Sequence, residues 1–338
     1  MAVIWDKKGI FFTFAAIVLS IVIIFSLDVY TGYRLKEKME VTEIRIDTMN
    51  NFIKNLENDI GNAIFISGFR SLLSMEDYLM ANNDAANPPH FLDDLGTDLD
   101  TAFSEAFLKG TITGTSGTER MSIMDNNTFL NWTERMKVEA NKIGIELEFT
   151  VDEGDVDIDQ SGPWTVEITV RLDIDAVDKN SIALWDINNK EYTATINITS
   201  EYKDGMGKNK FVDPLYLVNT DGTANNTIRE TPYSNWPADL SNHLNGYFYR
   251  ENSDAPNYLD RFEDSNSGTY GIESIVKRLK DKGLLDNTRS AIDHIHFPTS
   301  VASPPSCSVV DIADTDFKLD RSDTPSTTHV GFYGTSCI

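Results

Sequence analysis

Two short spacings in the sequence place potential metal ligands close together. In the first, Asp155, Asp157 and Asp159 alternate along the chain like the first half of a calcium-binding loop. Such a loop needs a glycine at its sixth position and a carboxylate at its twelfth, where this chain has Gln160 and Val166. We therefore interpret the three aspartates as the solvated face of a strand.

The second spacing joins His294 and His296. On a strand, residues two apart point to the same face, so two imidazoles can hold one ion, with Asp293 adjacent and His329 as a further donor. The sequence identifies no third ligand, and a chain with five histidines produces such a pair by chance. We predict no metal site and no cofactor.

Known catalytic motifs are absent from the sequence. It contains no Gly-x-Ser-x-Gly, no phosphate-binding loop with lysine, no His-Glu-x-x-His and no dinucleotide fingerprint. Trp132, Trp164, Trp185 and Trp236 suit either a buried core, which we favour, or a sugar-binding surface. We predict no catalytic residues and no enzyme.

Helical patterns fill the first part of the chain. Apolar residues at three- and four-residue steps predict a long amphipathic helix over residues 34–66. Further helices are predicted at Phe69–Leu79, Phe91–Leu108 and Asn127–Lys142, with 110–117 as a loop. The apolar stripe of the first helix comprises Val41, Ile44, Met49, Phe52, Ile53, Leu56, Ile60 and Ile64. It either packs on its own domain, which we favour, or mediates self-association.

Strict alternation of apolar and polar residues follows at 145–151, 166–174 and 192–198. Alternation leaves one face of a strand buried and one in solvent, as in an antiparallel sheet. The fold class is therefore α+β. The weaker patterns nearer the C-terminus predict helices at 241–249 and 271–282, and strands at 290–297, 317–319 and 330–333.

The composition is strongly acidic. The 29 basic residues face 53 acidic ones, a formal charge of −24 over 338 residues. Such a surface repels phosphates, so we expect no nucleic-acid partner. It suits a solvated cell-surface protein, a high-salt habitat or loose binding of divalent cations, and composition does not choose among them.

Ile10–Leu27 is the longest apolar stretch of the chain and contains no charge. As a helix, its eighteen residues span about 27 Å, close to the hydrocarbon core of a bilayer. It is a removable secretory signal, an uncleaved membrane anchor, or a helix that is kept after removal of a short leader. No Ala-x-Ala cleavage site follows it, which disfavours the first interpretation.

The junction of Lys7, Lys8 and Gly9 with the apolar stretch resembles the class III signal peptide of an archaeal type IV prepilin. The resemblance reaches to about residue 60 and implies cleavage after Gly9, with Lys8, Gly9 and Ile10 as processing residues. It also implies that the hydrophobic helix stays on the mature protein, in the membrane or in a filament core. Phe14 stands where bacterial pilins carry a glutamate, and the length fits a minor pilin or an anchored ectodomain better than a major pilin.

This resemblance implies a cell-surface structural or adhesion protein. Its partners would be membrane lipid, other pilin-like subunits or further copies through the N-terminal helix, and a surface ligand or carbohydrate. Its place would be the cell membrane, as a single-pass protein with an extracellular C-terminal domain, or an extracellular pilus-like filament. The alternative is a single-span receptor, sensor or hydrolase ectodomain.

Charge counting favours the opposite orientation. Arg34, Lys36, Lys38 and Arg45 follow the apolar stretch, whereas only two lysines precede it. By the positive-inside rule this places the C-terminal side in the cytoplasm. We favour the outside orientation because of the prepilin-like leader and the glycosylation sequons.

With the C-terminal domain outside, Cys307 and Cys337 are expected to form a disulfide worth about 3 kcal/mol. The alternative is two unrelated buried thiols. Four Asn-x-Ser/Thr sequons are compatible with a glycoprotein, at Asn126, Asn131, Asn197 and Asn225.

These patterns divide the chain into five parts. They are a leader at 1–9, a transmembrane or filament-core helix at 10–27, an amphipathic stalk helix at 28–66, a helical region at 67–142, and a sheet-containing head domain with a cysteine-containing tail at 143–338.

Overall fold

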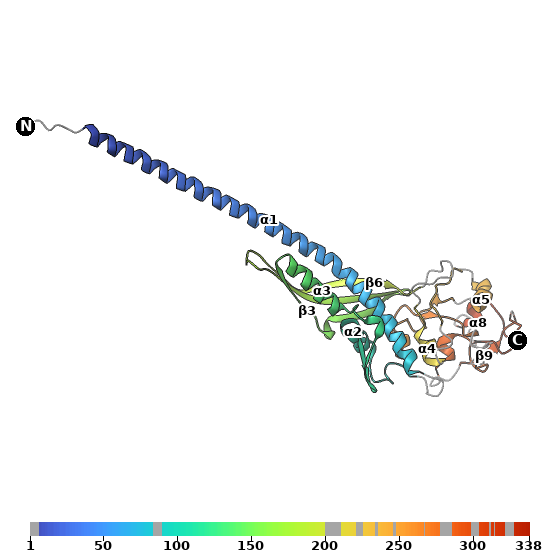
Figure 1. Ribbon diagram of the computed structural model, residues 1–338. Coiled ribbons are helices and arrows are strands. Elements are labelled where there is room, and N and C mark those ends of the chain that lie inside the picture. The colour runs from blue at the N-terminus through green and yellow to red at the C-terminus, as the bar shows by residue number, and fades with distance from the viewer. Residues whose placement is uncertain are drawn as a thin grey trace, which may run out of the picture.

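A long helix projects from a head of mixed helix and sheet (Figure 1). The predicted α+β class is confirmed. The computed structural model describes residues 7–83, 90–199, 211–220, 226–233, 236–245, 248–266, 268–277, 286–298, 304–310, 312–313, 315–321 and 328–338.

Helix α1 (Lys7–Asn82) runs unbroken for 76 residues, so it is about 110 Å long. The predicted separate helix at Phe69–Leu79 is therefore wrong as a separate element and forms the end of α1. Among the described side chains of α1, the first buried one is Met49. The helix thus has an outer part before Met49, which extends away from the head, and an inner part that packs within it (Figure 1).

The predicted apolar stripe divides at the same point. Val41 and Ile44 are exposed, whereas Met49, Ile53 and Leu56 are buried in the head, as are Ile60 and Ile64. Packing on the protein's own domain is therefore confirmed from Met49 onward.

Arg45 fastens α1 where it leaves the head. Its Nε donates to Asp178 Oδ1 at 2.6 Å, and its Nη2 donates to the carbonyl of Gly144 at 2.8 Å. Burial alone would raise the pKa of Asp178, but the hydrogen bonds from Arg45 and from the backbone N–H of Asn180 and of Ile182 lower it. The carboxylate thus stays ionised beside the guanidinium.

A helical layer follows α1 in the sequence. It contains α2 (Leu99–Lys109), the hairpin of β1 (Thr111–Gly114) and β2 (Gly117–Arg120), η1 (Ser122–Met124) and α3 (Phe129–Lys142). The helix at 127–142 is confirmed, whereas the loop at 110–117 is wrong because those residues form the hairpin.

The helix predicted at 91–108 begins only at Leu99 in the structure. Asp98 is extended, and its side chain accepts a hydrogen bond from the backbone N–H of Thr101, so it caps α2. At the other end, Gly110 adopts a left-handed conformation with φ of 75°, which stops the helix.

The main sheet is antiparallel throughout. Its strands are β3 (Ile145–Thr150), β4 (Val156–Gly162), β5 (Thr165–Asp178) and β6 (Leu184–Asn197), with η2 (Glu153–Asp155) before β4. The central strand β5 pairs with β3 and β4 along one edge and with β6 along the other. The three predicted strands are confirmed, and β6 begins earlier than its alternating pattern.

One face of this sheet is buried. Every second residue of β5, from Val166 to Asp178, is buried, and the residues between are partly or fully exposed. On β4, Asp157 and Asp159 are exposed, as expected for the solvated face of a strand, whereas Asp155 precedes the strand in η2 and is partly exposed. Helix α1 lies on the buried face, where a Cβ on Gly68 would stand 2.1 Å from Ile168 Cδ1.

The C-terminal lobe is built from short elements. They are α4 (Pro214–Asn219), α5 (Trp236–Asn245), β7 (Arg250–Glu251), η3 (Asp260–Phe262), β8 (Ile272–Glu273), α7 (Asp293–His296), β9 (Ser306–Ser308), β10 (Lys318–Asp320) and α8 (His329–Phe332). Strands β7 and β8 pair, as do β9 and β10.

Several predictions fail in this lobe. The helix at 271–282 is wrong over 271–276, where β8 pairs with β7 and Ile275 forms a β-bridge with Ile292; residue 277 is helical, and 278–282 lie outside the described residues. The strands at 290–297 and 330–333 are wrong, since these segments contain the helical turns α7 and α8. The strand at 317–319 is confirmed as β10. The helix at 241–249 is confirmed only to Asn245, where α5 ends, because Tyr249 forms a β-bridge with Glu230.

Two apolar clusters hold the head together. The larger joins α1, α2, α3 and the sheet, and also takes in Phe211, Tyr258 and Phe262 of the C-terminal lobe. The smaller lies within that lobe and includes Tyr216, Phe317 and Tyr333. The lobe is thus packed directly on the inner part of α1.

Two glycines of α1 test the close approach of helix and sheet. Gly61 has no atom within 4 Å of an added Cβ, so Gly61→Ala should raise the free energy of unfolding by about 0.5–1 kcal/mol. Gly68→Ala should lower it by about 1–3 kcal/mol because the methyl group overlaps Ile168. Urea unfolding of the full-length chain in detergent measures both.

A second-site change checks the cause. Ile168→Val removes the overlapping Cδ1 atom, so it should cost less in the Gly68→Ala background than alone. Additive effects of the two substitutions would show that the overlap is not the reason.

A buried glutamate ties α1 to the C-terminal lobe. Glu76 Oε1 accepts hydrogen bonds from Tyr258 Oη and from the backbone N–H of Val212, both at 2.9 Å. Burial raises the pKa of Glu76 well above 4.5, with Asp77 and Asp213 adding to the rise and the two hydrogen bonds opposing it. At pH values between about 4.5 and this raised pKa, Glu76 is therefore protonated in the folded chain and ionised in the unfolded chain.

This difference predicts how stability depends on pH. As pH rises from about 4.5 toward the raised pKa, the free energy of unfolding should fall by up to about 1.4 kcal/mol per pH unit. Glu76→Gln keeps the acceptor oxygen but cannot ionise, so its stability relative to the wild type should increase with pH across this window. Urea unfolding at a series of pH values measures the difference.

Glu146→Gln is the matched control, because it removes the charge of an exposed glutamate on β3. If both variants show the same pH dependence relative to the wild type, the burial of Glu76 is not its cause.

Candidate functional site

The outer part of α1 carries the predicted processing and anchoring residues. Lys8, Gly9 and Ile10 lie in the first turns of α1, and their side chains lie outside the described set. None of the helices in the described part of the chain has an apolar stretch sufficient to cross a membrane. The predicted transmembrane helix at Ile10–Leu27 is therefore not supported by this structure.

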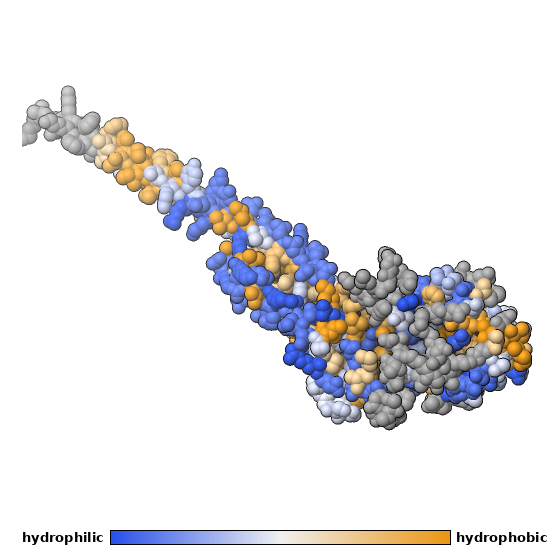
Figure 2. Space-filling model, turned by 45° about the vertical axis from the view of Figure 1, so that its right-hand side comes forward, coloured by the Kyte–Doolittle hydropathy of each residue, from blue (hydrophilic) through white to orange (hydrophobic). Residues whose placement is uncertain are grey.

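From Phe14 to Tyr30, however, α1 exposes large apolar side chains on every face. Figure 2 shows them as an orange band near the far end of the helix, separated from the head by a stretch in which hydrophilic residues dominate. We call them the apolar sleeve: Phe14, Ile17, Val18, Leu19, Ile21, Val22, Ile23, Ile24, Phe25, Leu27, Val29 and Tyr30. Exposed fractions of 43% for Val18 to 66% for Phe14 show that the head covers none of this sleeve.

The two cysteines are joined in the structure. Cys307 and Cys337 form a disulfide with their Cα atoms 5.5 Å apart. Cys337 also forms a backbone bridge with Val309, and the N–H of Ile338 donates to the carbonyl of Ser308. The end of the chain is therefore held against β9.

The sequons differ in how their hydroxyl groups are engaged. Asn126, Asn131 and Asn197 are exposed, and Asn225 lies outside the described residues. Thr128 and Thr133, the hydroxyl residues of the first two sequons, are buried; Thr128 caps α3 and Thr133 donates to the carbonyl of Leu130. In the third, the partly exposed Thr199 hydroxyl donates to Asn197 Oδ1 at 2.6 Å.

The tryptophans belong mainly to the core. Trp132 is buried, and its indole N–H donates to Asp59 Oδ2 of α1 at 3.1 Å. Trp164 and Trp185 are partly buried and pack against the larger apolar cluster. Trp236 begins α5, with its side chain outside the described set.

A buried arginine organises the C-terminal lobe. Arg261 of η3 donates through Nη1 to Asp213 Oδ2 at 2.7 Å and to Asp293 Oδ2 at 3.0 Å, and through Nη2 to the carbonyl of Ile272. Tyr249 Oη donates to the same Asp213 oxygen at 2.7 Å. We call these groups the arginine centre; it joins segments separated by 48 and 32 residues.

The charges of the arginine centre do not balance when both carboxylates are ionised. Burial raises the pKa of Asp213 to about 6, with Arg261 opposing the rise and Asp293 adding to it. Asp213 therefore takes up a proton as the pH falls below about 6. Asp213 also caps α4, because its Oδ1 accepts from the backbone N–H of Leu215 at 2.9 Å.

Next to the arginine centre, Glu273 of β8 lies at the middle of a second cluster. Its Oε2 atom lies 3.1 Å from His294 Nε2 and 3.0 Å from His329 Nε2. Arg250 pairs with Oε1, and Asn252 Nδ2 donates to Oε2 at 2.5 Å. We call Glu273, His294 and His329 the glutamate–histidine cluster.

Asp320 fixes the far side of this cluster. Its Oδ1 atom lies 2.8 Å from His329 Nδ1 and accepts a hydrogen bond from Ser290 Oγ, also at 2.8 Å. Burial alone would lower the pKa of His329, but Glu273 and Asp320 raise it to about 9. Burial alone would raise the pKa of Glu273, yet His329, His294 and Arg250 hold it well below 4.5.

Neither Ser290 nor Thr231, two hydroxyl residues near histidines of the lobe, forms a nucleophile with a general base. The Ser290 hydroxyl faces the Asp320 carboxylate rather than an imidazole. Thr231 Oγ1 lies 2.9 Å from His243 Nε2, but the other ring nitrogen faces Tyr333 Oη rather than a carboxylate. Burial also lowers the pKa of His243. A hydroxyl nucleophile needs an imidazole that a third group orients and stabilises in its charged form, and a phenol supplies no negative charge.

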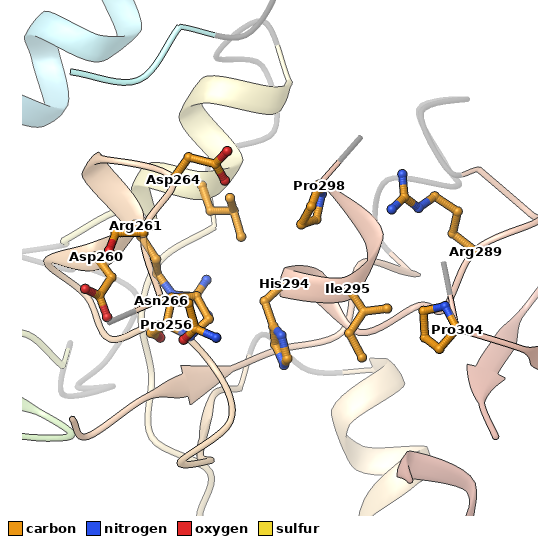
Figure 3. Close-up of a pocket in the computed structure, with 12 residues that line it drawn as sticks. Pro256, Asp260, Arg261, Asp264, Asn266, Arg289, His294, Ile295, Pro298 and Pro304 are labelled. Atoms are coloured by element: carbon orange, nitrogen blue, oxygen red, sulfur yellow. The ribbon is translucent and has the colours of Figure 1, made fainter. Parts of the chain in front are cut away.

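A cavity of about 510 Å³ is lined by one residue of each cluster, Arg261 and His294. Figure 3 shows His294 in its wall, between Arg261 and Asp260 on one side and Ile295, with Arg289, on the other. Its volume lies in the range of small-molecule sites, about 300–1,000 Å³. The cavity therefore brings apolar, acidic and basic groups together at one place in the lobe.

The predicted histidine pair is corrected by this geometry. His294 and His296 lie on the helical turn α7, so they do not share the face of a strand. His294 reaches Glu273, whereas His296 Nδ1 lies 3.1 Å from the carbonyl of Ser290. The structure brings His294 together with His329, a residue that the sequence offered only as a further donor.

The remaining residues of both clusters carried no sequence signal. Arg250, Arg261 and Glu273 stand 11 to 23 residues apart, Asp213 lies further upstream, and no motif links them. Only a contact map would have paired them. The chain matches no protein-family model, no curated protein and no solved structure. Function is therefore inferred from its own residues and their geometry.

The arginine centre makes a direct prediction about stability. Arg261→Ala leaves two buried carboxylates without their cation and should lower the free energy of unfolding by about 3–5 kcal/mol. Urea unfolding of the full-length chain measures the loss.

Arg120→Ala provides the comparison, because Arg120 pairs with Asp125 in the open, with 76% of its side chain exposed. It should cost at most about 1 kcal/mol. Losses of similar size in the two variants would show that Arg261 does not organise the lobe.

Proposed function

We propose that this protein is a cell-surface structural or adhesion protein of the archaeal type IV pilin-like kind, held by its N-terminal helix, with no catalytic role. The observation that carries the proposal is the apolar sleeve. A helix that is apolar all round is stable only when lipid or other helices surround it, and the head of the same chain leaves the sleeve uncovered. Lipid is the first environment we propose for it, with Ile10–Leu27 as the membrane-embedded or filament-core segment.

The outer helix supports this proposal by its dimensions. The sleeve and the residues from Ile10 that precede it make about 20 residues of helix, the length that spans about 30 Å of hydrocarbon. The stretch from Tyr30 to Met49 is then a spacer between the bilayer surface and the head.

The disulfide supports an extracytoplasmic head. Structural disulfides persist in oxidising compartments and are rare in the cytosol, and the Cys307–Cys337 bond closes the C-terminal end of the lobe. We give this more weight than the basic residues Arg34, Lys36, Lys38 and Arg45, whose count favours the reverse orientation. The proposed location is the cell membrane with the head outside, or a pilus-like filament built from such subunits.

The cavity favours a second candidate, a single-span receptor or sensor ectodomain. A pocket of about 510 Å³ in the lobe farthest from the sleeve suits binding of a small surface ligand or a sugar. The two candidates share the anchor and differ in processing and assembly.

Anchoring is tested with one charged substitution inside the sleeve. Val22→Lys adds about 2.5–3.5 kcal/mol to the free energy of insertion if residue 22 lies near the bilayer centre, so the membrane-bound fraction should fall sharply. Flotation of the full-length chain with liposomes measures that fraction. Val41→Lys, at an exposed apolar position outside the sleeve, should leave flotation unchanged.

If the wild-type chain stays at the bottom of the gradient, the proposed anchor is wrong.

If the wild-type chain floats, mass spectrometry of the membrane fraction separates the two candidates. An N-terminus at Ile10 supports the pilin-like protein, and an intact leader supports the simple ectodomain. Protease added to intact cells should remove the head, and a protected head would contradict the outside orientation.

A further inference from the structure

We propose that the glutamate–histidine cluster binds one divalent transition-metal ion, and that Zn²⁺ is the ion its donors fit best. One carboxylate oxygen of Glu273, one ring nitrogen of His294 and one of His329 all lie within 4.8 Å of one another. Imidazole and carboxylate are typical zinc ligands, and two histidines with one glutamate are a known zinc donor set.

The spacing of the donor atoms suits a shared ion. Two ligands of a tetrahedral zinc ion, each about 2.1 Å from it, lie about 3.4 Å apart. Glu273 Oε2 lies 3.1 Å from the Nε2 atom of His294 and 3.0 Å from that of His329. The two glutamate–histidine distances thus need to change by only a few tenths of an ångström, whereas the ring nitrogens of His294 and His329, which lie within 4.8 Å of each other, must come closer together to share the ion.

The outer contacts of the cluster orient its ligands. Asp320 lies on Nδ1 of His329, so the Nε2 lone pair of a neutral His329 points toward Glu273. Ser290 in turn donates to Asp320. A carboxylate behind a ligating histidine is the usual second layer of a zinc site, because it sets the tautomer and the ring orientation.

The charges of the neighbouring groups are compatible with a bound cation. Arg250 pairs with Oε1 of Glu273, and Asn252 donates to Oε2, which also lies within hydrogen-bond distance of both imidazoles. With neutral imidazoles, two carboxylates and one guanidinium leave one negative charge buried. A proton on His329 neutralises it equally well, and this is the arrangement that the experiment must separate from a bound metal.

The cavity supplies access to the ion. Glu273 and His329 are buried, whereas His294 is partly exposed and lines the cavity. Figure 3 shows its ring within the cavity wall. A metal ion can thus enter beside His294, and three protein ligands leave a fourth position for water or for a donor group of a ligand in the cavity.

The test uses the full-length chain, stripped of metal with a chelator and purified in detergent. Titration with zinc in competition with a chromophoric chelator should show one ion per chain. His294→Gln removes a ligand and Asp320→Asn weakens the orientation of His329, so each should weaken binding at least about 10-fold. His296→Gln, on the same helical turn but outside the cluster, should leave the affinity unchanged.

Cobalt(II) bound to the wild-type chain gives a readout that needs no variant. A four-coordinate site with nitrogen and oxygen ligands produces an intense visible absorption, and zinc should abolish it by displacing the cobalt. Thermal unfolding of every variant without metal shows whether it is folded before its affinity is compared.

Absence of stoichiometric zinc binding by the wild-type chain would overturn the proposal and leave the cluster as a protonated ion-pair network. Equal affinities of the folded His294→Gln variant and the wild type would overturn it too. Neither result bears on the anchor, because flotation is measured independently of metal.

Discussion

The contact between the inner part of α1 and the buried face of the sheet is the interaction on which the head depends. It is tight because Gly68 lets the helix backbone approach Ile168. Ser67, Ser71 and Ser74 are buried along the same stretch of α1, where Ser67 and Ser71 contact the helical layer at Asn127 and Met124. Their hydroxyl groups are satisfied by carbonyl groups, so a polar stripe is buried without unpaired groups.

Buried charges continue this organisation into the C-terminal lobe, where regular structure is scarce. Glu76 joins α1 to Val212 and Tyr258, and the arginine centre joins η3 to α4 and α7. Segments of two to six residues cannot make extensive backbone ladders. Their mutual positions are fixed by specific side-chain contacts instead, which is the situation in which removing one partner of a buried pair is most costly.

The part of the fold that the sequence predicted is the part with long, regular periodicity. Alternation in β3, β5 and β6 and the three- and four-residue steps of α1 and α3 identified those elements, because burial on one face produces a repeating pattern. The hairpin of β1 and β2 was missed since it is only four residues per strand and rich in glycine, threonine and serine. The turns α7 and α8 were mistaken for strands because four residues do not establish a period.

The same limit applies to the candidate sites. The apolar sleeve was visible because it is a local property of composition. The glutamate–histidine cluster was not, because its ligands stand 21 and 56 residues from Glu273 and meet only through the packing of three short elements. A histidine pair at a short spacing drew attention to His294, and the fold replaced its predicted partner His296 with His329.

The length of α1 has a mechanical consequence. A pull between the outer end of the helix and the head would run along the helix axis, parallel to the surface that buries Met49 to Leu79. Such a load is borne in shear, so many contacts resist together instead of opening one after another. Arg45 would bear this force first, because it is hydrogen-bonded to Asp178 and Gly144 at the place where α1 leaves the head.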